Sequence, residues 1–221
     1  MLWIKICGFC DTESALLAAE LGANAIGLNF VARSKRRVSP ALASRIAASL
    51  RGRVEIVGIV EAMSLPQAEL LRNEFKLDSV QFHCPLELAD AQQLPSWAYW
   101  AVGVTGDRDS ANLSRFPGDR LLVDTIANGV TGGTGQCFDW SLVEQASHTR
   151  RIIVAGGLTP TNVASAIFRV RPFGVDVASG VEFSGRPGHK DPALMRSFIE
   201  QARDADAARR LETSGTSNKE T

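Results

Sequence analysis

A carboxylate at the end of an apolar run is the residue in this sequence best placed to do chemistry. The run Leu121 to Val123 is apolar and ends at Asp124, and a glycine-rich loop that contains Gly133 follows it. An ionised carboxylate beside an apolar wall needs a partner or a shifted pKa, so this position indicates a functional role. We expect Asp124 to lie at the mouth of a buried strand, with the rest of the chain built around it.

A cysteine and a lysine share one face of the first apolar run. Cys7 and Lys5 are two residues apart, so strand alternation places both on one face and puts Ile4 and Ile6 on the other. A thiol near an ammonium group can be activated, although a cysteine in a strand is more often a small, inert core residue. Lys5 could itself be an interior ammonium paired with a carboxylate, for which Asp176 is a candidate.

Two glycine-bearing segments have the composition of phosphate-binding loops. Gly156 and Gly157 follow one apolar run, and Ser179 and Gly180 follow the next. Glycine lets backbone N–H groups approach an anion closely, which makes these four residues phosphate candidates. Each glycine taken alone could equally serve only a tight turn.

Polar side chains that could hold the rest of a ligand follow two other runs. Arg36 lies in a basic loop, where its planar guanidinium could bind a carboxylate through two hydrogen bonds, although such a loop is often only a solvated rim. Gln81 and His83 end the fourth run, and His83 could act as an acid or a base. No spacing of His, Cys, Asp or Glu indicates a metal site, and no Gly-x-Gly-x-x-Gly indicates a dinucleotide.

Short apolar runs alternate with amphipathic stretches along the chain, which predicts a parallel sheet with helical crossovers. Eight runs read as strands, at residues 3–6, 25–29, 55–60, 79–82, 97–102, 120–123, 151–155 and 174–178. Helices are predicted at residues 11–21, 40–50, 65–74, 86–93, 140–146, 161–170 and 192–208. Eight strands at near-regular spacing favour an α/β fold with a single closed (β/α)8 TIM barrel over an open doubly wound sheet.

Two regions depart from this alternation. Residues 105–117 are rich in glycine, aspartate and proline, so we expect the fifth crossover helix to be short or absent. Near residue 204 the apolar spacing is lost, so we expect a catalytic barrel domain over residues 1–204 and a disordered tail over residues 205–221. In such a barrel the working face collects residues at the carboxyl ends of the strands, which is where the ligand-binding candidates fall.

The charge balance and the cysteines narrow the class of protein. Among 221 residues, 24 are basic and 24 acidic, so no overall field recruits nucleic acid or an anionic membrane. No apolar run can span a bilayer and the amino terminus lacks the apolar region of a signal peptide, so we expect a cytoplasmic protein. Cys7 and Cys10 form a Cys-x-x-Cys, but no second pair supports zinc, and a redox role would need a thioredoxin-like setting. We expect a monomer, with a homodimer as the alternative.

Several segments together resemble the phosphoribosylanthranilate isomerase family of tryptophan biosynthesis. The resemblance covers nearly the whole chain to about residue 204, and its segments are specific in order and spacing. They are residues 5–8, 34–36, 81–83, 123–125 with 132–135 and 138–140, 155–160 with 162–163, and 175–182 with 190–191. Family members are (β/α)8 barrels that convert N-(5-phosphoribosyl)anthranilate to 1-(2-carboxyphenylamino)-1-deoxyribulose 5-phosphate, an Amadori rearrangement that needs no cofactor.

The resemblance implies roles for three candidates. Asp124 would be the general acid, Cys7 the general base, and Arg36 the partner of the anthranilate carboxylate. Ring opening requires a proton on the furanose oxygen, which Asp124 can supply if its apolar strand keeps part of it protonated. The iminium then acidifies the proton on sugar C2, which Cys7 can remove as a thiolate. We expect the nearby Lys5 to raise the thiolate fraction.

The other candidates are expected to bind the substrate, a small phosphorylated aminosugar. The substrate-binding residues expected are Arg36, Gln81, His83, Gly133, Gly156, Gly157, Ser179 and Gly180. Neither a metal nor a cofactor is expected.

The sequence departs from the family pattern at some positions and leaves alternatives open. Phe9 and Cys10 replace a smaller β-branched pair in the first loop, and Cys84 follows His83 where glycine is usual. The related isomerase of histidine biosynthesis would need aspartates at the ends of the first and fifth strands, and neither is present. A Schiff-base aldolase would need a lysine at the barrel mouth, and Lys5 lies too deep. A non-catalytic barrel that binds phosphosugars is the alternative outside enzymes.

Overall fold

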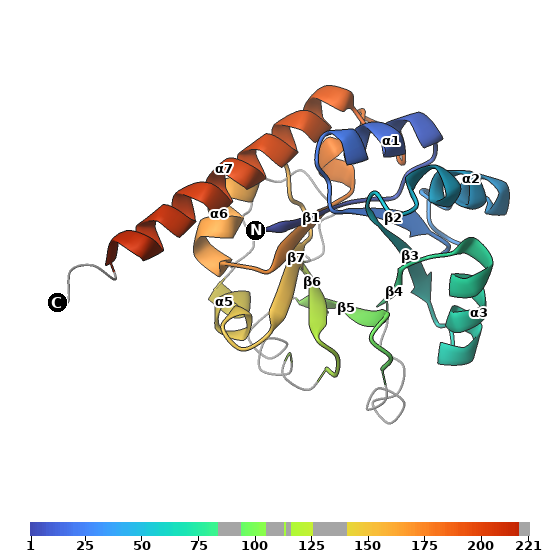
Figure 1. The fold of residues 1–221 in the computed structure, drawn as a ribbon, viewed down its shortest axis with the longest axis horizontal. Helices are drawn as coiled ribbons and strands as arrows, with labels where there is room; N and C mark the ends of the chain where they lie inside the picture. Colours follow the sequence, from blue (N-terminus) through green and yellow to red (C-terminus); the bar gives the residue numbers. More distant parts are fainter. Residues whose placement is uncertain (84–93, 105–112, 114–115, 126–140, 217–221) are drawn as a thin grey trace.

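Eight parallel strands close into one barrel (Figure 1). The computed structural model describes residues 1–83, 94–104, 113, 116–125 and 141–216. The strands follow one another around the barrel in sequence order, and β1 pairs with β8. They are β1 Trp3–Cys7, β2 Ala25–Asn29, β3 Glu55–Glu61, β4 Ser79–His83, β5 Ala98–Val104, β6 Arg120–Thr125, β7 Arg151–Ala155 and β8 Gly174–Val177. The predicted barrel and all its predicted strands are confirmed, and no strand end differs by more than two residues.

Helices join the strands and cover the outside of the barrel. They are α1 Thr12–Glu20, α2 Pro40–Leu50, α3 Leu65–Phe75, α5 Ser141–Ser147, α6 Val163–Val170, α7 Pro192–Thr216 and a short 3₁₀ helix, η3 Ser179–Val181. The predicted helix at 86–93 and most of the fifth crossover lie outside the described residues. Within the described ranges, no helix is long and apolar enough to cross a membrane.

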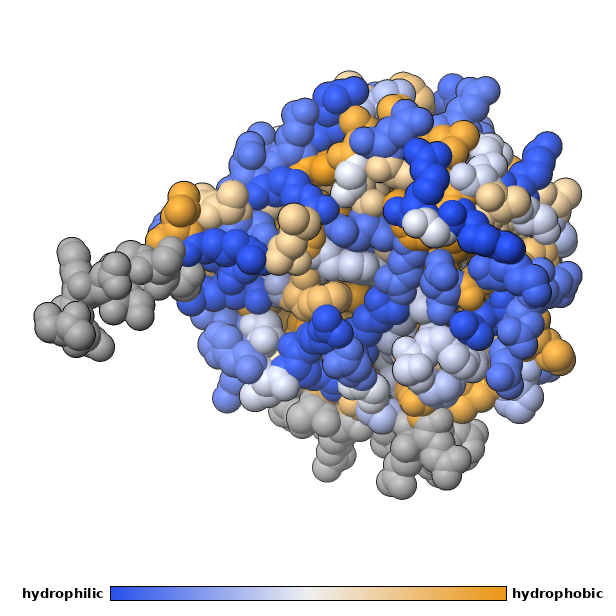
Figure 2. Space-filling view, viewed as in Figure 1, coloured by the Kyte–Doolittle hydropathy of each residue, from blue (hydrophilic) through white to orange (hydrophobic). Residues whose placement is uncertain are grey.

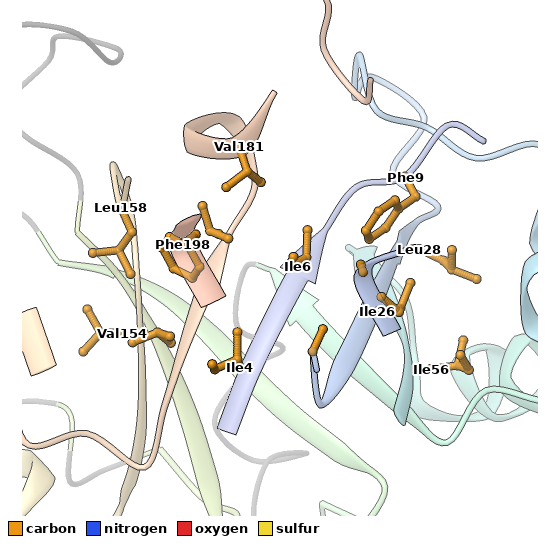
Figure 3. Packing of buried hydrophobic residues seen from close by; sticks show 14 of the residues in the cluster. Ile4, Ile6, Phe9, Ile26, Leu28, Ile56, Val154, Leu158, Val181 and Phe198 are labelled. Carbon is orange, nitrogen blue, oxygen red and sulfur yellow. The ribbon is translucent and has the colours of Figure 1, made fainter. Parts of the chain in front are cut away.

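Side chains of the strands alternate between two apolar clusters. Ile4 and Ile6 belong to the larger cluster, which lies between the strands and the helices and includes Phe198 of α7 (Figure 3). A smaller cluster fills the barrel interior with Ala25, Val57, Tyr99, Ala101, Leu122, Ile153 and Ala155. The predicted alternation of β1 is thereby confirmed, because Lys5 and Cys7 take the face opposite to Ile4 and Ile6.

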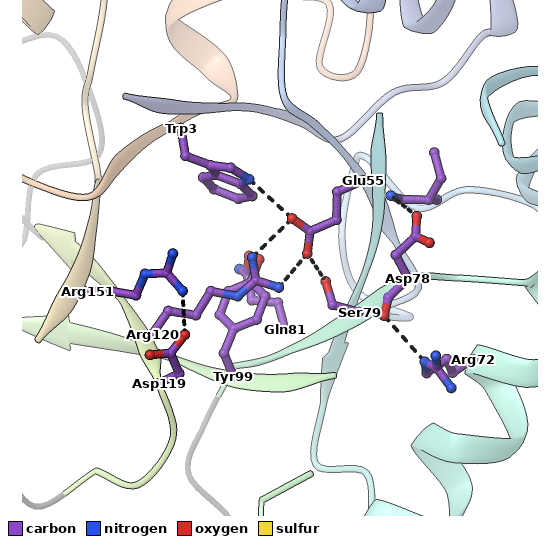
Figure 4. Close-up of polar contacts among 11 residues, drawn as sticks. Trp3, Glu55, Arg72, Asp78, Ser79, Gln81, Tyr99, Asp119, Arg120 and Arg151 are labelled. Atoms are coloured by element: carbon purple, nitrogen blue, oxygen red, sulfur yellow. Dashed lines mark hydrogen bonds and ion pairs between the residues drawn. The ribbon is translucent and has the colours of Figure 1, made fainter. Parts of the chain in front are cut away.

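A polar network closes the amino-terminal end of the barrel (Figure 4). The carboxylate of Glu55 accepts hydrogen bonds from Trp3 Nε1 at 3.1 Å, Ser79 Oγ at 2.6 Å and Arg120 Nη1 at 3.0 Å. The Arg120 guanidinium also lies 4.3 Å from the centroid of the Tyr99 ring. Trp3, Glu55, Ser79 and Arg120 each begin a strand, so the network ties four strands together at the end away from the candidate site.

The carboxyl-terminal helix is longer than the sequence predicts. We expected a disordered tail from residue 205, but α7 continues through Thr216 and its last turns project beyond the barrel (Figure 1). Asp206 is buried, and its carboxylate accepts hydrogen bonds from the backbone N–H of Leu2 at 2.9 Å and from Arg209 and Arg210. This helix is therefore fastened to the amino terminus by a polar contact, which a loss of apolar spacing does not reveal.

Replacing Glu55 with Gln should lower the free energy of unfolding by about 1–3 kcal/mol, because Arg120 would keep its largely buried place without a counter-charge. Burial alone would raise the pKa of Glu55, but Arg120, together with hydrogen bonds from Ser79 and Trp3, outweighs it and holds that pKa below its ordinary value. The stabilisation is thus complete above the unfolded pKa of about 4.3 and is lost as the pH falls through the lower folded pKa. Urea unfolding of both proteins from neutral to acidic pH measures the difference.

Asp119→Asn is the matched control, since Asp119 pairs with Arg151 on the surface with both side chains more than half exposed. It should change the free energy of unfolding by less than about 0.5 kcal/mol. Equal losses in the two variants would contradict a special contribution from the Glu55 network.

Candidate active site

The carboxyl ends of the strands bring the predicted site residues to one end of the barrel, called here the barrel mouth. Cys7 ends β1, His83 ends β4, and Asp124 lies one residue before the end of β6. The two glycine-bearing segments follow β7 and β8. Gly133 lies outside the described residues, as do Cys84 and Cys137.

A buried ion pair lies just below the barrel mouth. The Nζ atom of Lys5 is 2.9 Å from Oδ1 of Asp176, and the exposed fractions of the two side chains are 0% and 9%. The two residues are direct register partners across β1 and β8. Burial alone would lower the pKa of Lys5, but Asp176, together with Cys7 and Tyr99, outweighs it and that pKa lies above its ordinary value. Asp176 is therefore the partner of an interior ammonium, and Lys5 is a poor nucleophile.

The Cys7 thiol is buried, and its pKa lies above the ordinary value for a cysteine. Burial raises the pKa of Cys7, the Lys5 ammonium lowers it, and the Asp176 carboxylate raises it again, with a net increase. Lys5 therefore acts on Cys7 in the expected direction, but the expected net gain in thiolate is not found. The physical reason is burial, to which the Asp176 carboxylate adds.

The same surroundings raise the pKa of the Asp124 carboxyl, as the sequence predicts. Burial raises the pKa of Asp124, the Asp176 carboxylate raises it further, and Lys5 opposes both. Asp124 is paired in register with Gly103 of β5 and Ala155 of β7, neither of which offers a charge. A larger share of this carboxyl is therefore protonated near neutral pH than of an ordinary aspartate.

A chain of hydrogen bonds inside the barrel orients His83. Tyr99 Oη donates to Gln81 Oε1 at 3.1 Å, and Gln81 Nε2 lies 2.8 Å from His83 Nε2. Because Tyr99 occupies the amide oxygen, the amide nitrogen donates to His83 and leaves the imidazole proton on Nδ1. Burial lowers the pKa of His83, and Lys5 lowers it further. His83 is thus a hydrogen-bond donor through Nδ1 in its neutral form, which its lowered pKa favours. Its role as an acid or a base stays a prediction.

Arg36 is held by a carboxylate that the sequence analysis did not assign. Its Nε and Nη2 atoms donate to Glu182 at 2.8 and 2.7 Å, and this contact raises the pKa of Arg36 further. Glu182 also accepts from Lys190, whose side chain is completely buried. Glu182, Lys190 and Tyr99 are the residues that sequence reasoning missed. Their only signal was position, since Glu182 and Lys190 fall in segments that carry the family resemblance and Tyr99 lies in a predicted strand.

The two glycine-bearing loops touch each other. Gly156 and Gly157 adopt φ values of +87° and +61°, which side chains rarely allow. A Cβ atom at Gly180 would lie 1.9 Å from the carbonyl oxygen of Leu158, so only glycine permits this approach of the loop after β8 to the loop after β7. Gly156, Gly157, Ser179 and Gly180 are therefore gathered at one place on the barrel mouth.

The chain matches a family of known enzymes over most of its length. The model of the family described as N-(5'phosphoribosyl)anthranilate (PRA) isomerase matches residues 4–201. The chain belongs to this family. The N-(5'-phosphoribosyl)anthranilate isomerase of Pseudomonas fluorescens Pf-5 is 45% identical over 202 residues, which cover 90% of this chain and 94% of that protein. The corresponding enzyme of Desulforudis audaxviator is 38% identical over 208 residues, covering 93% and 100%.

Solved structures agree with this membership. The phosphoribosyl anthranilate isomerase of Thermotoga maritima superposes with a TM-score of 0.80 and 38% identity, over 92% of this chain and 100% of that one. A second isomerase structure, with a TM-score of 0.77, 36% identity and the same coverage, holds reduced 1-(o-carboxyphenylamino)-1-deoxyribulose 5-phosphate. The family resemblance, the barrel fold and the activity of a phosphoribosylanthranilate isomerase in tryptophan biosynthesis are confirmed.

Removing the Asp176 charge should make Cys7 more reactive. In Asp176→Asn, Lys5 loses its counter-charge while the thiol loses a nearby negative charge, and both changes lower the pKa of Cys7. Alkylation of Cys7 by iodoacetamide at neutral pH, followed by mass spectrometry of its peptide, should be faster than in the wild type. Asp119→Asn, which removes a carboxylate from the far end of the barrel, should leave the rate unchanged. A slower or unchanged rate in Asp176→Asn would contradict this electrostatic account.

Proposed function

We propose that Asp124 and Cys7 are the general acid and general base of the Amadori rearrangement of N-(5-phosphoribosyl)anthranilate. The observation that carries the proposal is that both groups end up at the barrel mouth, on strands β6 and β1, with pKa values raised by the same burial. A raised pKa suits an acid at Asp124, and a thiol that ionises only when a cation forms beside it suits a base at Cys7. The ligand described for the relative with 36% identity supports a carboxylated, phosphorylated product of this kind.

The first step is opening of the furanose ring. Protonated Asp124 gives its proton to the ring oxygen, the C1–O bond breaks, and the electron pair on the anthranilate nitrogen forms the C1=N iminium. The positive charge of the iminium is absent from the ground state. Charge that appears during reaction in a buried site changes the pKa of neighbouring groups more strongly than it would in water.

The second step is loss of the proton on C2. The positive iminium favours ionisation of the Cys7 thiol, which releases its proton to solvent. The thiolate then takes the proton on C2 as the C2–H electron pair forms the C1=C2 bond of the enolamine and the iminium nitrogen becomes neutral. Loss of the proton on the C2 oxygen and gain of one at C1 give the ketone of the product. Because the iminium is the nearest new cation, it lowers the pKa of Cys7 at the moment when a base is needed. Asp124 finishes the cycle as a carboxylate and Cys7 as a thiol. The proton that the thiol released to solvent balances the one that Asp124 takes up before the next turnover.

The remaining candidates bind the two ends of the substrate. The guanidinium of Arg36 receives the anthranilate carboxylate, and the backbone of Gly156, Gly157, Ser179 and Gly180 receives the phosphate. Between these ends, the Nδ1–H group of His83 donates to the sugar, with Gln81 holding the ring in place. Gly133, which follows β6 in the sequence, is the last of the proposed substrate-binding residues.

A monomer is our proposal for the oligomeric state. The face in Figure 2 is mostly hydrophilic, with hydrophobic residues in separate places. Among the described residues, the large exposed hydrophobic side chains come from several elements, including Leu70 of α3, Phe168 of α6 and Leu211 of α7. A homodimer is the alternative, since one Thermotoga maritima relative is described as a monomeric form of a dimeric enzyme.

Turnover of phosphoribosylanthranilate should depend on both members of the pair. Asp124→Asn keeps the shape of the side chain but removes the acid, and Cys7→Ser replaces the thiol with a hydroxyl that ionises far less readily. Each variant should lose at least about a hundredfold in kcat, as expected when a general acid or base is removed. Steady-state fluorescence assays of freshly prepared substrate measure this loss.

The control is Cys10→Ser, which changes the other cysteine of the first loop and should keep kcat within a few-fold of the wild type. Full activity in Asp124→Asn or Cys7→Ser would show that the catalytic residues lie elsewhere in the same barrel. A wild-type protein that binds a reduced product analogue but turns nothing over would favour the non-catalytic phosphosugar-binding barrel.

A further inference from the structure

A buried charged cluster beside the proposed acid and base takes no part in the proton transfers. It consists of Arg36, Glu182 and Lys190, and is called here the clamp. The side chains of Glu182 and Lys190 are only 5% and 0% exposed. Removing two charges from water is costly, and a hydrophobic pair would serve packing equally well. The clamp therefore calls for a functional explanation.

Glu182 fixes the plane of the Arg36 guanidinium. Its Oε1 accepts from Arg36 Nε at 2.8 Å and its Oε2 accepts from Arg36 Nη2 at 2.7 Å, which is a parallel, two-bond contact. Oε1 also accepts from Lys190 Nζ and from the backbone N–H of Gly188, both at 2.8 Å. A substrate carboxylate would have to break all four bonds to displace Glu182, so Glu182 stays in place when substrate binds.

The contact with Glu182 leaves one edge of Arg36 available. A guanidinium has five N–H bonds, of which Glu182 engages the one on Nε and one on Nη2. The edge formed by Nη1 and the second N–H of Nη2 has no hydrogen-bonding partner among the described residues. The Arg36 side chain is 28% exposed, which leaves part of it accessible to a ligand. Two N–H bonds on one edge match the two oxygens of a carboxylate.

Lys190 attaches the clamp to the rest of the site. Its Nζ atom donates to Glu182, to the carbonyl oxygen of Cys7 at 2.6 Å and to that of Ala178 at 3.0 Å, which uses all three of its N–H bonds. Cys7 carries the proposed base, and Ala178 immediately precedes the proposed phosphate loop. One ammonium group thus links the three parts of the site.

We infer that Glu182 and Lys190 are positioning residues that make Arg36 selective for the aromatic carboxylate of the substrate. Glu182 aims the open edge of Arg36, and Lys190 fixes that edge relative to the base and the phosphate loop. The two cations and one anion of the clamp leave a single positive charge, which matches one carboxylate. This inference rests on the proposed function for the identity of the ligand, but its test needs no turnover.

The test compares the affinities of two stable ligands. One is the reduced product analogue 1-(2-carboxyphenylamino)-1-deoxyribitol 5-phosphate, and the other is its phenylamino counterpart, which lacks only the carboxylate. Wild type should prefer the carboxylated ligand. Glu182→Gln should weaken its binding by about 10- to 100-fold, the range for charge-assisted hydrogen bonds, and leave the affinity for the phenylamino ligand unchanged. Isothermal titration calorimetry measures both affinities. An unchanged affinity for the phenylamino ligand shows that the variant is folded.

Two controls separate positioning from other effects. In an Arg36→Met background, Glu182→Gln should cause no further loss for the carboxylated ligand, because the edge that Glu182 aims is absent. If Glu182→Gln does not fold, Glu182→Asp decides instead, since it keeps the charge but is too short to hold both nitrogens of Arg36.

Two results would overturn the inference. Equal losses for both ligands would mean that Glu182 has only a structural role. Tighter binding of the carboxylated ligand to Glu182→Gln would mean that Glu182 competes with the substrate carboxylate instead of aiming Arg36 at it. Failure of the proposed function would give a different result. The wild type would not turn over phosphoribosylanthranilate, although it would still prefer the carboxylated ligand.

Discussion

The ion pair between Lys5 and Asp176 is the contact on which the chemistry of the barrel mouth depends. It joins β1 to β8, where the barrel closes, with an N–O distance of 2.9 Å. Its two charges act on Cys7, His83 and Asp124 in opposite directions, and for each group burial is the largest cause of the pKa shift. Burial therefore decides the pKa values of the thiol and of the carboxyl, and raises both. Without Asp176, the Lys5 ammonium would lower both pKa values. This would favour the thiolate of Cys7 but leave Asp124 ionised, without the proton that the proposed acid needs.

The two ends of the barrel differ in the role of their charged groups. At the amino-terminal end, Glu55 and Arg120 satisfy each other and hold four strands in register. At the mouth, the charges that matter arrive with the substrate: a carboxylate, a phosphate and, during reaction, an iminium. Because the pKa values of the proposed acid and base are both raised, the proposed mechanism lets both groups respond to that iminium.

Local patterns in the sequence predicted the elements well, and long-range partners explain what they did not predict. Apolar runs identified every strand, and the two-residue spacing of Lys5 and Cys7 was enough to place both inside the barrel. The sequence could not show that burial and Asp176 together outweigh the effect of Lys5 on Cys7, because that depends on distances between strands. The same holds for Glu182, which is 146 residues from Arg36 along the chain, and for Asp206 of α7, which accepts a hydrogen bond from Leu2.

The most direct test of the central claim is the kinetic isotope effect with substrate deuterated at sugar C2, measured in the wild type, Cys7→Ser and Asp124→Asn. If Cys7 removes the C2 proton, Cys7→Ser slows that step and the isotope effect on kcat should become larger than in the wild type. If Asp124 opens the ring, Asp124→Asn slows an earlier step and the isotope effect should shrink toward unity. An increase in Asp124→Asn with no increase in Cys7→Ser would contradict the assignment of acid and base.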